Sequence, residues 1–371
     1  MLRLLIAYAL SVGSALAAEF KDDVKLVADG ITLSLDAEPG QVLVSPRFQG
    51  TVMVSTLDGE SLGWINRDKV RTGKGGVGGA DRFWFAPDGS RYTVFFDPQV
   101  PLEEKNWRPP PEVLNGPMKV LDKSEREVVM EKDIRLTNHP GTAFSTRLKR
   151  KVRILDAKTS TANLGMSWPG ELNYVGFRVE NEVTNLGNAW KAEDGLLSLW
   201  SLSTFQGGES VEVRMRLPKD GTVRRYFEPF RENQLTIEKQ IARFRCDGNW
   251  WSKIGLYPKD ALGLMLSVDR ERKLLTVVRY KAAKGKRFPR AERGDVGDPY
   301  DGDMANVYNH GMLDRSDFPA PLFYEMESAS PMPELGKGES ISHWHEVMHF
   351  RGEVGMLESF AAKLLKSYHD G

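Results

Sequence analysis

Two glutamates near the C-terminal end of the chain could move protons. Glu325 and Glu327 alternate with Tyr324 and Met326 in a largely apolar run. Side chains in a strand point alternately to its two faces, so both carboxylates share one face. Neighbouring carboxylates in a cleft raise one another's pKa, which suits a general acid or base near neutral pH. We therefore predict Glu325 and Glu327 as catalytic residues; the alternative is that they form the hydrophilic surface of a strand.

An arginine lies on the apolar face of another predicted strand. Within residues 144–154, Arg150 has the same strand parity as Phe144, Leu148 and Val152. A charge on an apolar face needs a partner or a wet cavity. We predict that Arg150 reaches into a polar cleft and binds an anionic or hydroxyl-rich ligand. A salt bridge inside the fold and a β-bulge that shifts the register are the alternatives.

A glycine-rich segment, residues 75–80, precedes a charged pair and an aromatic residue. No Gly-Lys-Ser/Thr follows it, which excludes a P-loop, and no predicted helix follows it, which excludes a dinucleotide fingerprint. A glycine backbone can still approach a ligand closely. We predict that Asp81 and Arg82 hydrogen-bond to a ligand and that Trp84 is a stacking platform. The alternative is a turn in which Asp81 pairs with Arg82 or with the backbone.

Tryptophan is frequent in this chain, which contains nine. An aromatic face beside polar donors suits the alternating apolar and hydroxylated surfaces of sugars, although tryptophan is also an ordinary core residue. We expect about two or three of the nine at a binding site. We select Trp84 and Trp200 as substrate-binding residues, together with Lys253, which shares a strand face with Trp251.

Three histidines, His343, His345 and His349, have the same strand parity. Two histidines separated by one residue can donate two metal ligands from a strand, with a third ligand from elsewhere. His349 would lie about 13 Å from His345 along a strand, which is too far to complete that set. The sequence leaves open whether His343 and His345 bind a metal, and we predict no metal site and no cofactor.

Short alternating runs punctuated by turn residues must position these side chains. The chain contains 35 Gly and 20 Pro, and this punctuation is typical of an all-β sandwich or barrel. The alternation of apolar and polar residues predicts strands over residues 92–96, 210–217 and 274–280.

One long amphipathic helix is predicted at the C-terminus. Its apolar residues recur at helical spacing and are Met356, Leu357, Phe360, Leu364 and Leu365. Two segments rich in glycine and charge, residues 71–80 and 287–303, are predicted loops. Loops of this length in a compact β fold often serve binding, and mobile surface insertions are the alternative.

The composition limits the partners of the protein. The 371 residues include 51 Lys plus Arg and 51 Asp plus Glu, and a zero formal charge without long basic runs argues against nucleic acid. With 27% charged and 40% hydrophobic residues, the chain is globular rather than disordered. Because Cys246 is the single cysteine, no intramolecular disulfide can form, and we predict a buried or unpaired thiol rather than a nucleophile.

The first 17 residues have the features of a secretory signal peptide. A positive charge at Arg3 precedes an apolar run, residues 4–12, and an Ala-x-Ala pattern ends at Ala17. The run is shorter than the roughly 20 residues that a bilayer span needs. We predict a periplasmic or secreted protein that lacks a membrane span after cleavage and has a single domain over residues 18–371. A membrane-anchored N-terminus is the alternative.

The order of several segments resembles the galactose mutarotase-like β-supersandwich superfamily, and most closely an uncharacterised secreted bacterial family within it. The matching stretches are residues 75–87, 144–155, 174–204 and 323–350. The resemblance implies an all-β fold, a large antiparallel β-supersandwich with a short C-terminal helix. In mutarotases a glutamate on a late strand acts as general base, and Glu325 is the best match, with Glu327 second.

Mutarotases also use two histidines, one beside a Gly-Gly turn and one at the end of a strand. At the first position this sequence has Asp81 and Arg82, and the second region contains Trp200 followed by Ser201. The resemblance therefore implies a sugar-binding cleft more directly than it implies mutarotase activity.

Taken together, the residues and the resemblance predict a carbohydrate-active protein whose partner is a mono- or oligosaccharide. As an enzyme it would be an aldose epimerase-like isomerase, in which Glu325 or Glu327 moves a proton at a sugar. Arg150, Arg82 or Lys253 would then stabilise the developing negative charge. The alternatives are a non-catalytic carbohydrate-binding module and a lyase-type enzyme on an acidic polysaccharide, whose carboxylates would be neutralised by Arg and Lys.

Overall fold

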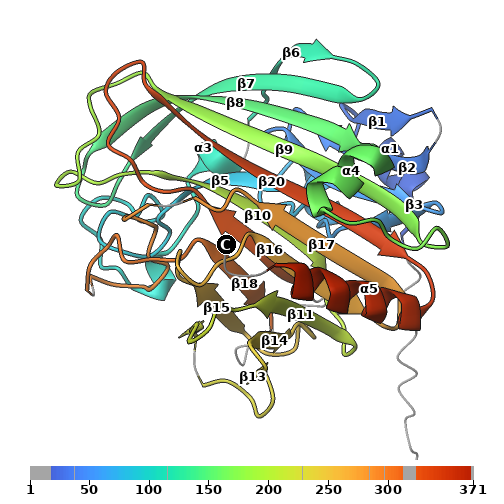
Figure 1. Cartoon of the computed structure of the whole chain (residues 1–371). Coiled ribbons are helices and arrows are strands. Elements are labelled where there is room, and N and C mark those ends of the chain that lie inside the picture. Colours follow the sequence, from blue (N-terminus) through green and yellow to red (C-terminus); the bar gives the residue numbers. More distant parts are fainter. Residues whose placement is uncertain are drawn as a thin grey trace, which may run out of the picture.

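Strands in three antiparallel sheets dominate the computed structural model (Figure 1). The structure describes residues 18–36, 38–114, 116–227, 229–283, 285–295, 297–311 and 323–368. The predicted signal peptide, residues 1–17, lies outside the described residues. The predicted all-β fold class is confirmed, because long antiparallel strands form most of the regular structure that is described.

The largest sheet has ten strands in the order β13-β14-β11-β16-β17-β20-β9-β8-β7-β6. In chain order these strands are β6 (Lys119–Lys123), β7 (Glu127–Thr137), β8 (Ala143–Leu155), β9 (Asn173–Asn185), β11 (Val211–Arg216), β13 (Leu235–Glu238), β14 (Ile241–Arg245), β16 (Leu264–Asp269), β17 (Leu274–Tyr280) and β20 (Ser340–Arg351). Long strands at its centre, β8, β9 and β20, run side by side in Figure 1.

A second sheet of six strands faces the first and has the order β12-β15-β18-β19-β10-β5. Its strands are β5 (Arg82–Ala86), β10 (Ser198–Gln206), β12 (Arg224–Tyr226), β15 (Ser252–Leu256), β18 (Ala305–Asn309) and β19 (Phe323–Ala329). A small N-terminal sheet packs against β8 and β9 and consists of β1 (Ile31–Leu35), β2 (Glu38–Ser45), β3 (Thr51–Leu57) and β4 (Glu60–Leu62).

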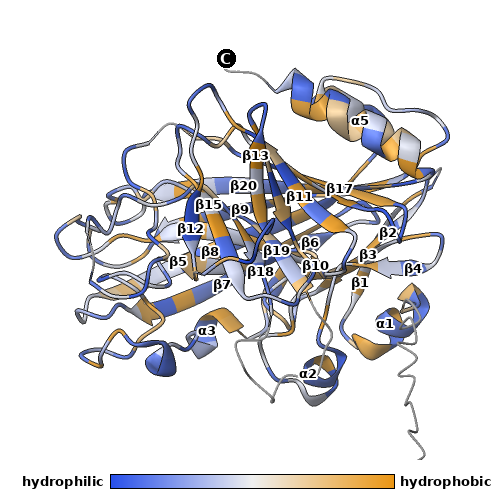
Figure 2. Cartoon of the chain, turned by 90° about the horizontal axis from the view of Figure 1, so that it is seen from below, coloured by the Kyte–Doolittle hydropathy of each residue, from blue (hydrophilic) through white to orange (hydrophobic). Residues whose placement is uncertain are grey.

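Helices are short apart from the one at the C-terminus. They are α1 (Phe20–Leu26), α2 (Arg67–Thr72), the 3₁₀ turn η1 (Glu104–Asn106), α3 (Pro111–Leu114), α4 (Ala157–Leu164) and α5 (Val354–Ser367). The predicted C-terminal helix is confirmed: α5 buries Leu357, Phe360 and Leu364 against β16 and β17, while polar residues lie between them in sequence (Figure 2). Within the described residues, none of the helices has the length and apolarity to cross a membrane.

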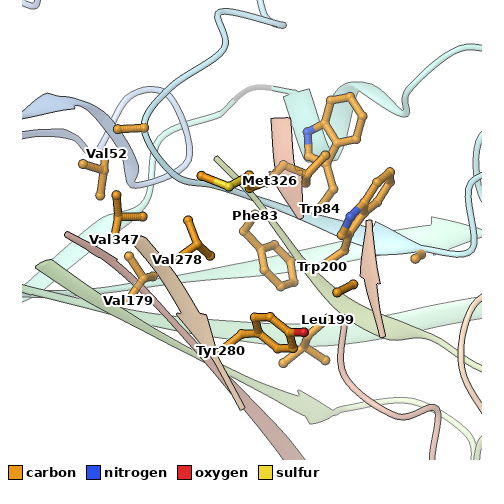
Figure 3. Packing of buried hydrophobic residues seen from close by; sticks show 14 of the residues in the cluster. Val52, Phe83, Trp84, Val179, Leu199, Trp200, Val278, Tyr280, Met326 and Val347 are labelled. Atoms are coloured by element: carbon orange, nitrogen blue, oxygen red, sulfur yellow. The ribbon is translucent and has the colours of Figure 1, made fainter. Parts of the chain in front are cut away.

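The main core lies between the two large sheets. Val179, Val278 and Val347 from the ten-stranded sheet pack in one cluster with Phe83 and Met326 from the six-stranded sheet (Figure 3). Each such side chain stabilises the fold by about 1.5–3 kcal/mol when it is fully buried. Since strand side chains alternate, this packing uses one face of the six-stranded sheet and leaves its other face for a binding site.

Two of the three strands predicted from alternation are confirmed, and one prediction is wrong. Residues 211–216 and 274–280 form β11 and β17, whereas residues 92–96 form no strand. Val94, Phe95 and Phe96 are buried, but the carbonyls of this segment are bound by separate parts of the chain. The backbone N–H of His139 donates to the carbonyl of Thr93, and that of Arg108 donates to the carbonyl of Phe95. Apolar residues are thus buried here without a neighbouring strand.

Candidate functional site

A cavity of about 910 Å³ lies over the face of the six-stranded sheet that points away from the core. Side chains of the sheet form its floor, and they are Arg82, Trp84, Trp200, Leu202, Lys253, Tyr308, Glu325 and Glu327. Phe323, at the start of β19, contributes to its walls. The flanking segments form the rest of the walls with Trp64, Asn66, Lys69, Gly75, Gly76, Gly78, Asp88, Glu104, Lys105, Trp107, Pro109, Leu114, Phe227, Trp251, Arg293, His310 and Gly311.

The strand register explains why residues far apart in sequence meet on this floor. Lys253 pairs with Tyr308 across β15 and β18, and Tyr308 pairs with Glu325 across β18 and β19. Glu325 in turn pairs with Thr204 across β19 and β10. Directly opposed residues of neighbouring strands share a face, so this row of four crosses the sheet on the cavity side.

Glu325 is held by an arginine and a threonine. Arg82 Nη2 donates to Glu325 Oε1 at 2.8 Å, and Thr204 Oγ1 donates to the same oxygen at 3.1 Å. The guanidinium of Arg82 also lies over the ring of Trp84, 4.8 Å from its centroid. A charge-assisted hydrogen bond of this kind is stronger than a neutral one and fixes the position of the carboxyl group.

Glu327 is held by a lysine and a tryptophan. Lys253 Nζ donates to Glu327 Oε2 at 2.9 Å, and Trp200 Nε1 donates to the same oxygen at 3.1 Å. Burial raises the pKa of Glu327 to about 7, because loss of solvent and the charge of Glu325 outweigh the opposing charge of Lys253. Burial alone would lower the pKa of Lys253, but the charge of Glu327 raises it overall, so the ammonium stays protonated.

The two carboxylates can therefore act as an acid and base pair. Each uses one oxygen in these contacts, and Glu325 Oε2 and Glu327 Oε1 have no hydrogen-bond partner among the described residues. A carboxyl group with a pKa near 7 can both donate and accept a proton at neutral pH. The prediction that Glu325 and Glu327 share one face is confirmed, because Met326 packs in the core between the sheets.

Aromatic side chains form much of the walls. Phe227 and Trp251 stack with centroids 3.9 Å apart, and on another wall Phe323 stacks on His310 at 4.3 Å and contacts Trp64 at 4.4 Å. Several tryptophan faces thus border a polar floor, an arrangement suited to the mixed apolar and hydroxylated surface of a sugar.

Arg293 links the wall near Trp107 to two acidic residues. Its Nη1 donates to Asp88 Oδ2 at 3.1 Å and its Nε donates to Glu104 Oε2 at 3.0 Å, while its guanidinium lies 4.8 Å from the Trp107 centroid. The loops predicted at residues 71–80 and 287–303 both reach the cavity, through Gly75, Gly76 and Gly78 in one and Arg293 in the other.

Six of the eight site residues predicted from sequence line this cavity, and they come from four strands: Arg82 and Trp84, Trp200, Lys253, and Glu325 and Glu327. Trp84 and Trp200 are register partners whose rings meet edge to face at 5.8 Å, and both are visible in Figure 3.

The structure places Asp81 and Arg150 elsewhere. Both side chains are completely buried and form an ion pair, in which Arg150 also donates to Asn181 Oδ1 at 2.7 Å and to the Gly50 carbonyl at 2.8 Å. Burial raises the pKa of Asp81 to about 6, against the charge of Arg150. This is the internal salt bridge that the sequence left as an alternative for Arg150, and neither residue lines the cavity.

The three histidines of β20 point into the interior between the sheets. His343 and His345 each share a hydrogen bond of 2.8 Å with Ser328 Oγ, and His349 Nδ1 bonds Thr276 Oγ1 at 2.9 Å. Burial lowers the pKa of His343 and of His349 to about 3. In the part of the chain that the structure describes, no group of three or more His, Cys, Asp or Glu residues is arranged to hold a metal ion.

Sequence reasoning missed Tyr308 and His310 among the cavity residues. His310 looked isolated because no other histidine lies near it in sequence, yet Tyr308 Oη and His310 Nδ1 share a hydrogen bond of 3.0 Å beside Glu325. Alternation along β18 and the residue that follows it could have placed Tyr308 and His310 on one face. The sequence could not show that β18 lies beside β19, which carries Glu325.

Residues 18–368 match a protein family described as a family of unknown function, DUF6786. The chain belongs to the DUF6786 family. No curated protein matches this DUF6786 chain at the sequence level.

Solved structures similar to this DUF6786 protein share its galactose mutarotase-like fold. A candidate aldose 1-epimerase from Escherichia coli has a TM-score of 0.54 and 12% identity, with coverage of 86% of this chain and 98% of that one. A Synechocystis protein has a TM-score of 0.53 and 10% identity over 87% and 96% of the two chains. A galactose mutarotase-like protein from Lactobacillus casei has a TM-score of 0.51 and 12% identity over 86% and 99%. The predicted resemblance in fold is confirmed.

Proposed function

We propose that this DUF6786 protein is a carbohydrate-active enzyme that binds a sugar in the cavity and exchanges protons with it through Glu325 and Glu327. The observation that carries the proposal is the position of the two carboxylates, which lie side by side on the floor of a cavity walled by tryptophans. Their cationic partners, Arg82 and Lys253, come from other strands of the same sheet.

The best-supported reaction is the interconversion of sugar anomers. Glu325, held in place by Arg82, would accept the proton of the hydroxyl on the anomeric carbon. Protonated Glu327 would donate its proton to the ring oxygen as the bond between that oxygen and the anomeric carbon breaks, which gives the open-chain aldehyde. Rotation and ring closure with the two roles reversed would return both protons, so that both carboxyl groups end as they began. Lys253 would stabilise Glu327 while it is ionised.

A non-catalytic carbohydrate-binding module is the second candidate. One observation favours it: both carboxylates already have cationic partners, as in purely structural ion pairs. The same observation weakens a lyase-type role, because Arg82 and Lys253 are engaged with protein carboxylates rather than directed at an acidic ligand.

The test is anomer exchange of glucose, galactose, xylose and galacturonic acid, followed by NMR in the presence of the protein of residues 18–371. The variants are Glu325→Gln and Glu327→Gln. Loss of a general acid or base should slow the exchange by roughly 100- to 10,000-fold. Glu358→Gln is the matched control, because Glu358 lies on α5, outside the cavity, and its carboxylate is bonded to Arg214 of β11.

The outcomes separate the two candidates. Catalysed exchange that is lost in both cavity variants and kept in Glu358→Gln supports the enzyme. Sugar binding without any accelerated exchange, unaffected by either cavity variant, would identify the binding module instead.

We also propose that the protein is exported. The apolar run of residues 4–12 and the small residues that end at Ala17 support this, and the DUF6786 match begins directly after them, at residue 18. Amino-terminal sequencing of the protein recovered from the periplasm or the medium should begin at Ala18. Recovery of the protein with residues 1–17 still attached in the membrane fraction would contradict the proposal.

A further inference from the structure

The aromatic residues that line the cavity differ in their exposure. On the floor, Trp84 and Trp200 are 8% and 6% exposed and lie against Arg82 and Lys253. On the walls, Trp251 and Trp64 are only half-buried, and both line the cavity. Exposed aromatic surface grouped in a concave site is characteristic of a place where a ligand binds.

The wall at Trp251 is built as a rigid platform. Phe227 stacks on Trp251 with an interplanar angle of 8°, so the two rings support one another. Phe227 adopts a φ of 63°. This left-handed backbone conformation is unfavourable for a bulky residue, because its Cβ atom clashes with the backbone. Backbone strain of this kind persists where the surrounding structure imposes it, and it is concentrated at ligand-binding sites.

The platform is close in the chain to a residue that holds one of the carboxylates. Trp251 precedes Lys253 by two residues, which is a separation of about 7 Å along an extended chain. Lys253 is the residue bonded to Glu327. A sugar ring in contact with Glu327 would therefore end near Lys253, and the Trp251 face would remain for the next ring of a chain.

The size of the cavity agrees with a ligand of more than one ring. Its volume of about 910 Å³ lies near the upper end of the roughly 300–1,000 Å³ found for sites that enclose drug-sized molecules. One monosaccharide at the floor would leave the Phe227–Trp251 wall and the Trp64–Phe323 wall uncovered.

We propose that the ligand is an oligosaccharide of at least two linked rings, with the inner ring at Glu325 and Glu327 and the next ring stacked on Trp251. This inference rests on the proposed function only for the inner ring. The apolar face of a pyranose matches an aromatic surface, and its hydroxyls match the polar groups of the floor.

The test compares ligands of increasing length by isothermal titration calorimetry. The probes are glucose, xylose, galactose and galacturonic acid, each with its linked disaccharide and tetrasaccharide. In at least one series, affinity should rise roughly tenfold from the monosaccharide to the disaccharide, as one aromatic stacking contact provides. Trp251→Ala should abolish that rise and leave the affinity for the monosaccharide unchanged, and Trp251→Phe should restore most of it.

Trp344→Ala is the matched control. Trp344 is also half-buried and lies against Arg178 and Arg279, but it is on the outer face of β20, away from the cavity. This variant should keep the full dependence on length. Equal affinity across every series, absence of binding to every probe, or an equal loss for monosaccharide and disaccharide in Trp251→Ala would each overturn the proposal.

Measurement in a Glu325→Gln background separates this inference from the proposed enzyme function. If anomer exchange is never catalysed but affinity still rises with length through Trp251, the enzyme function fails and the oligosaccharide site stands. If exchange is catalysed but affinity does not depend on length, the oligosaccharide site fails and the enzyme function stands.

Discussion

Replacement of Lys253 by methionine tests the electrostatic account of the cavity floor. The ammonium of Lys253 lies 2.9 Å from Glu327 Oε2 and 5.1 Å from the centroid of the Trp200 ring. Methionine has a similar length and can keep the contact with Trp200, so Lys253→Met removes mainly the charge. Glu327 would then be buried beside Glu325 without its cationic partner.

The size of the effect follows from the distance. Two unit charges 2.9 Å apart attract by about 6 kcal/mol at an effective dielectric constant of about 20, and by about 3 kcal/mol if cavity water doubles that constant. Since about 1.4 kcal/mol corresponds to one pH unit, the lower value moves the titration of Glu327 upward by about two pH units. Glu327, whose pKa is raised to about 7, should therefore stay protonated at pH 8 in the variant.

Infrared difference spectroscopy over a pH titration can follow the carbonyl band of the protonated carboxyl group. The band is assigned to Glu327 if it is absent from the spectrum of Glu327→Gln. Lys281→Met is the control, since it removes a lysine that bonds the Ser342 backbone rather than a carboxylate on the floor. A band in Lys253→Met that still titrates near pH 7, or at a lower pH, would refute the proposed coupling between Lys253 and Glu327.

Three further predictions concern stability. Arg150→Met should lower the free energy of unfolding by about 3–5 kcal/mol, because it leaves Asp81 buried without its partner, and adding Asp81→Asn should recover part of the loss; urea denaturation showing a change below about 1 kcal/mol would contradict this. Burial lowers the pKa of His343 and His349 to about 3, so between pH 6.5 and pH 3 the unfolded chain binds the additional protons and stability should fall as the pH falls. Because the raised pKa values of Asp81 and Glu327 act in the opposite direction over the same range, melting temperatures are compared between the wild type and His349→Gln. An equal pH dependence in both proteins would show that His349 is not kept neutral. Phe360→Ala on α5 should lower the free energy of unfolding by about 3–5 kcal/mol, because it leaves a cavity against the ten-stranded sheet. Calorimetry that shows an unchanged melting temperature would contradict the packing of α5 on this sheet.

The sequence by itself determined the features that depend on local geometry. Alternation along a strand predicted that Glu325 and Glu327 share a face, and the 3.6-residue period predicted the helix that became α5. Both predictions succeeded because the backbone fixes the direction of successive side chains within one element. At residues 92–96 the same alternation predicted a strand, but this segment is buried without forming one.

Only the tertiary structure decided which of these faces meet and which charges pair. Arg150 is on an apolar strand face, as the sequence indicated, but its partner Asp81 lies 69 positions away and makes the pair an internal one. Lys253 and Glu327 are 74 positions apart and come together only because β15, β18 and β19 are neighbours in register. A one-residue shift of a strand would send every side chain to the opposite face, so the composition of the cavity depends on long-range strand pairing that no local pattern specifies.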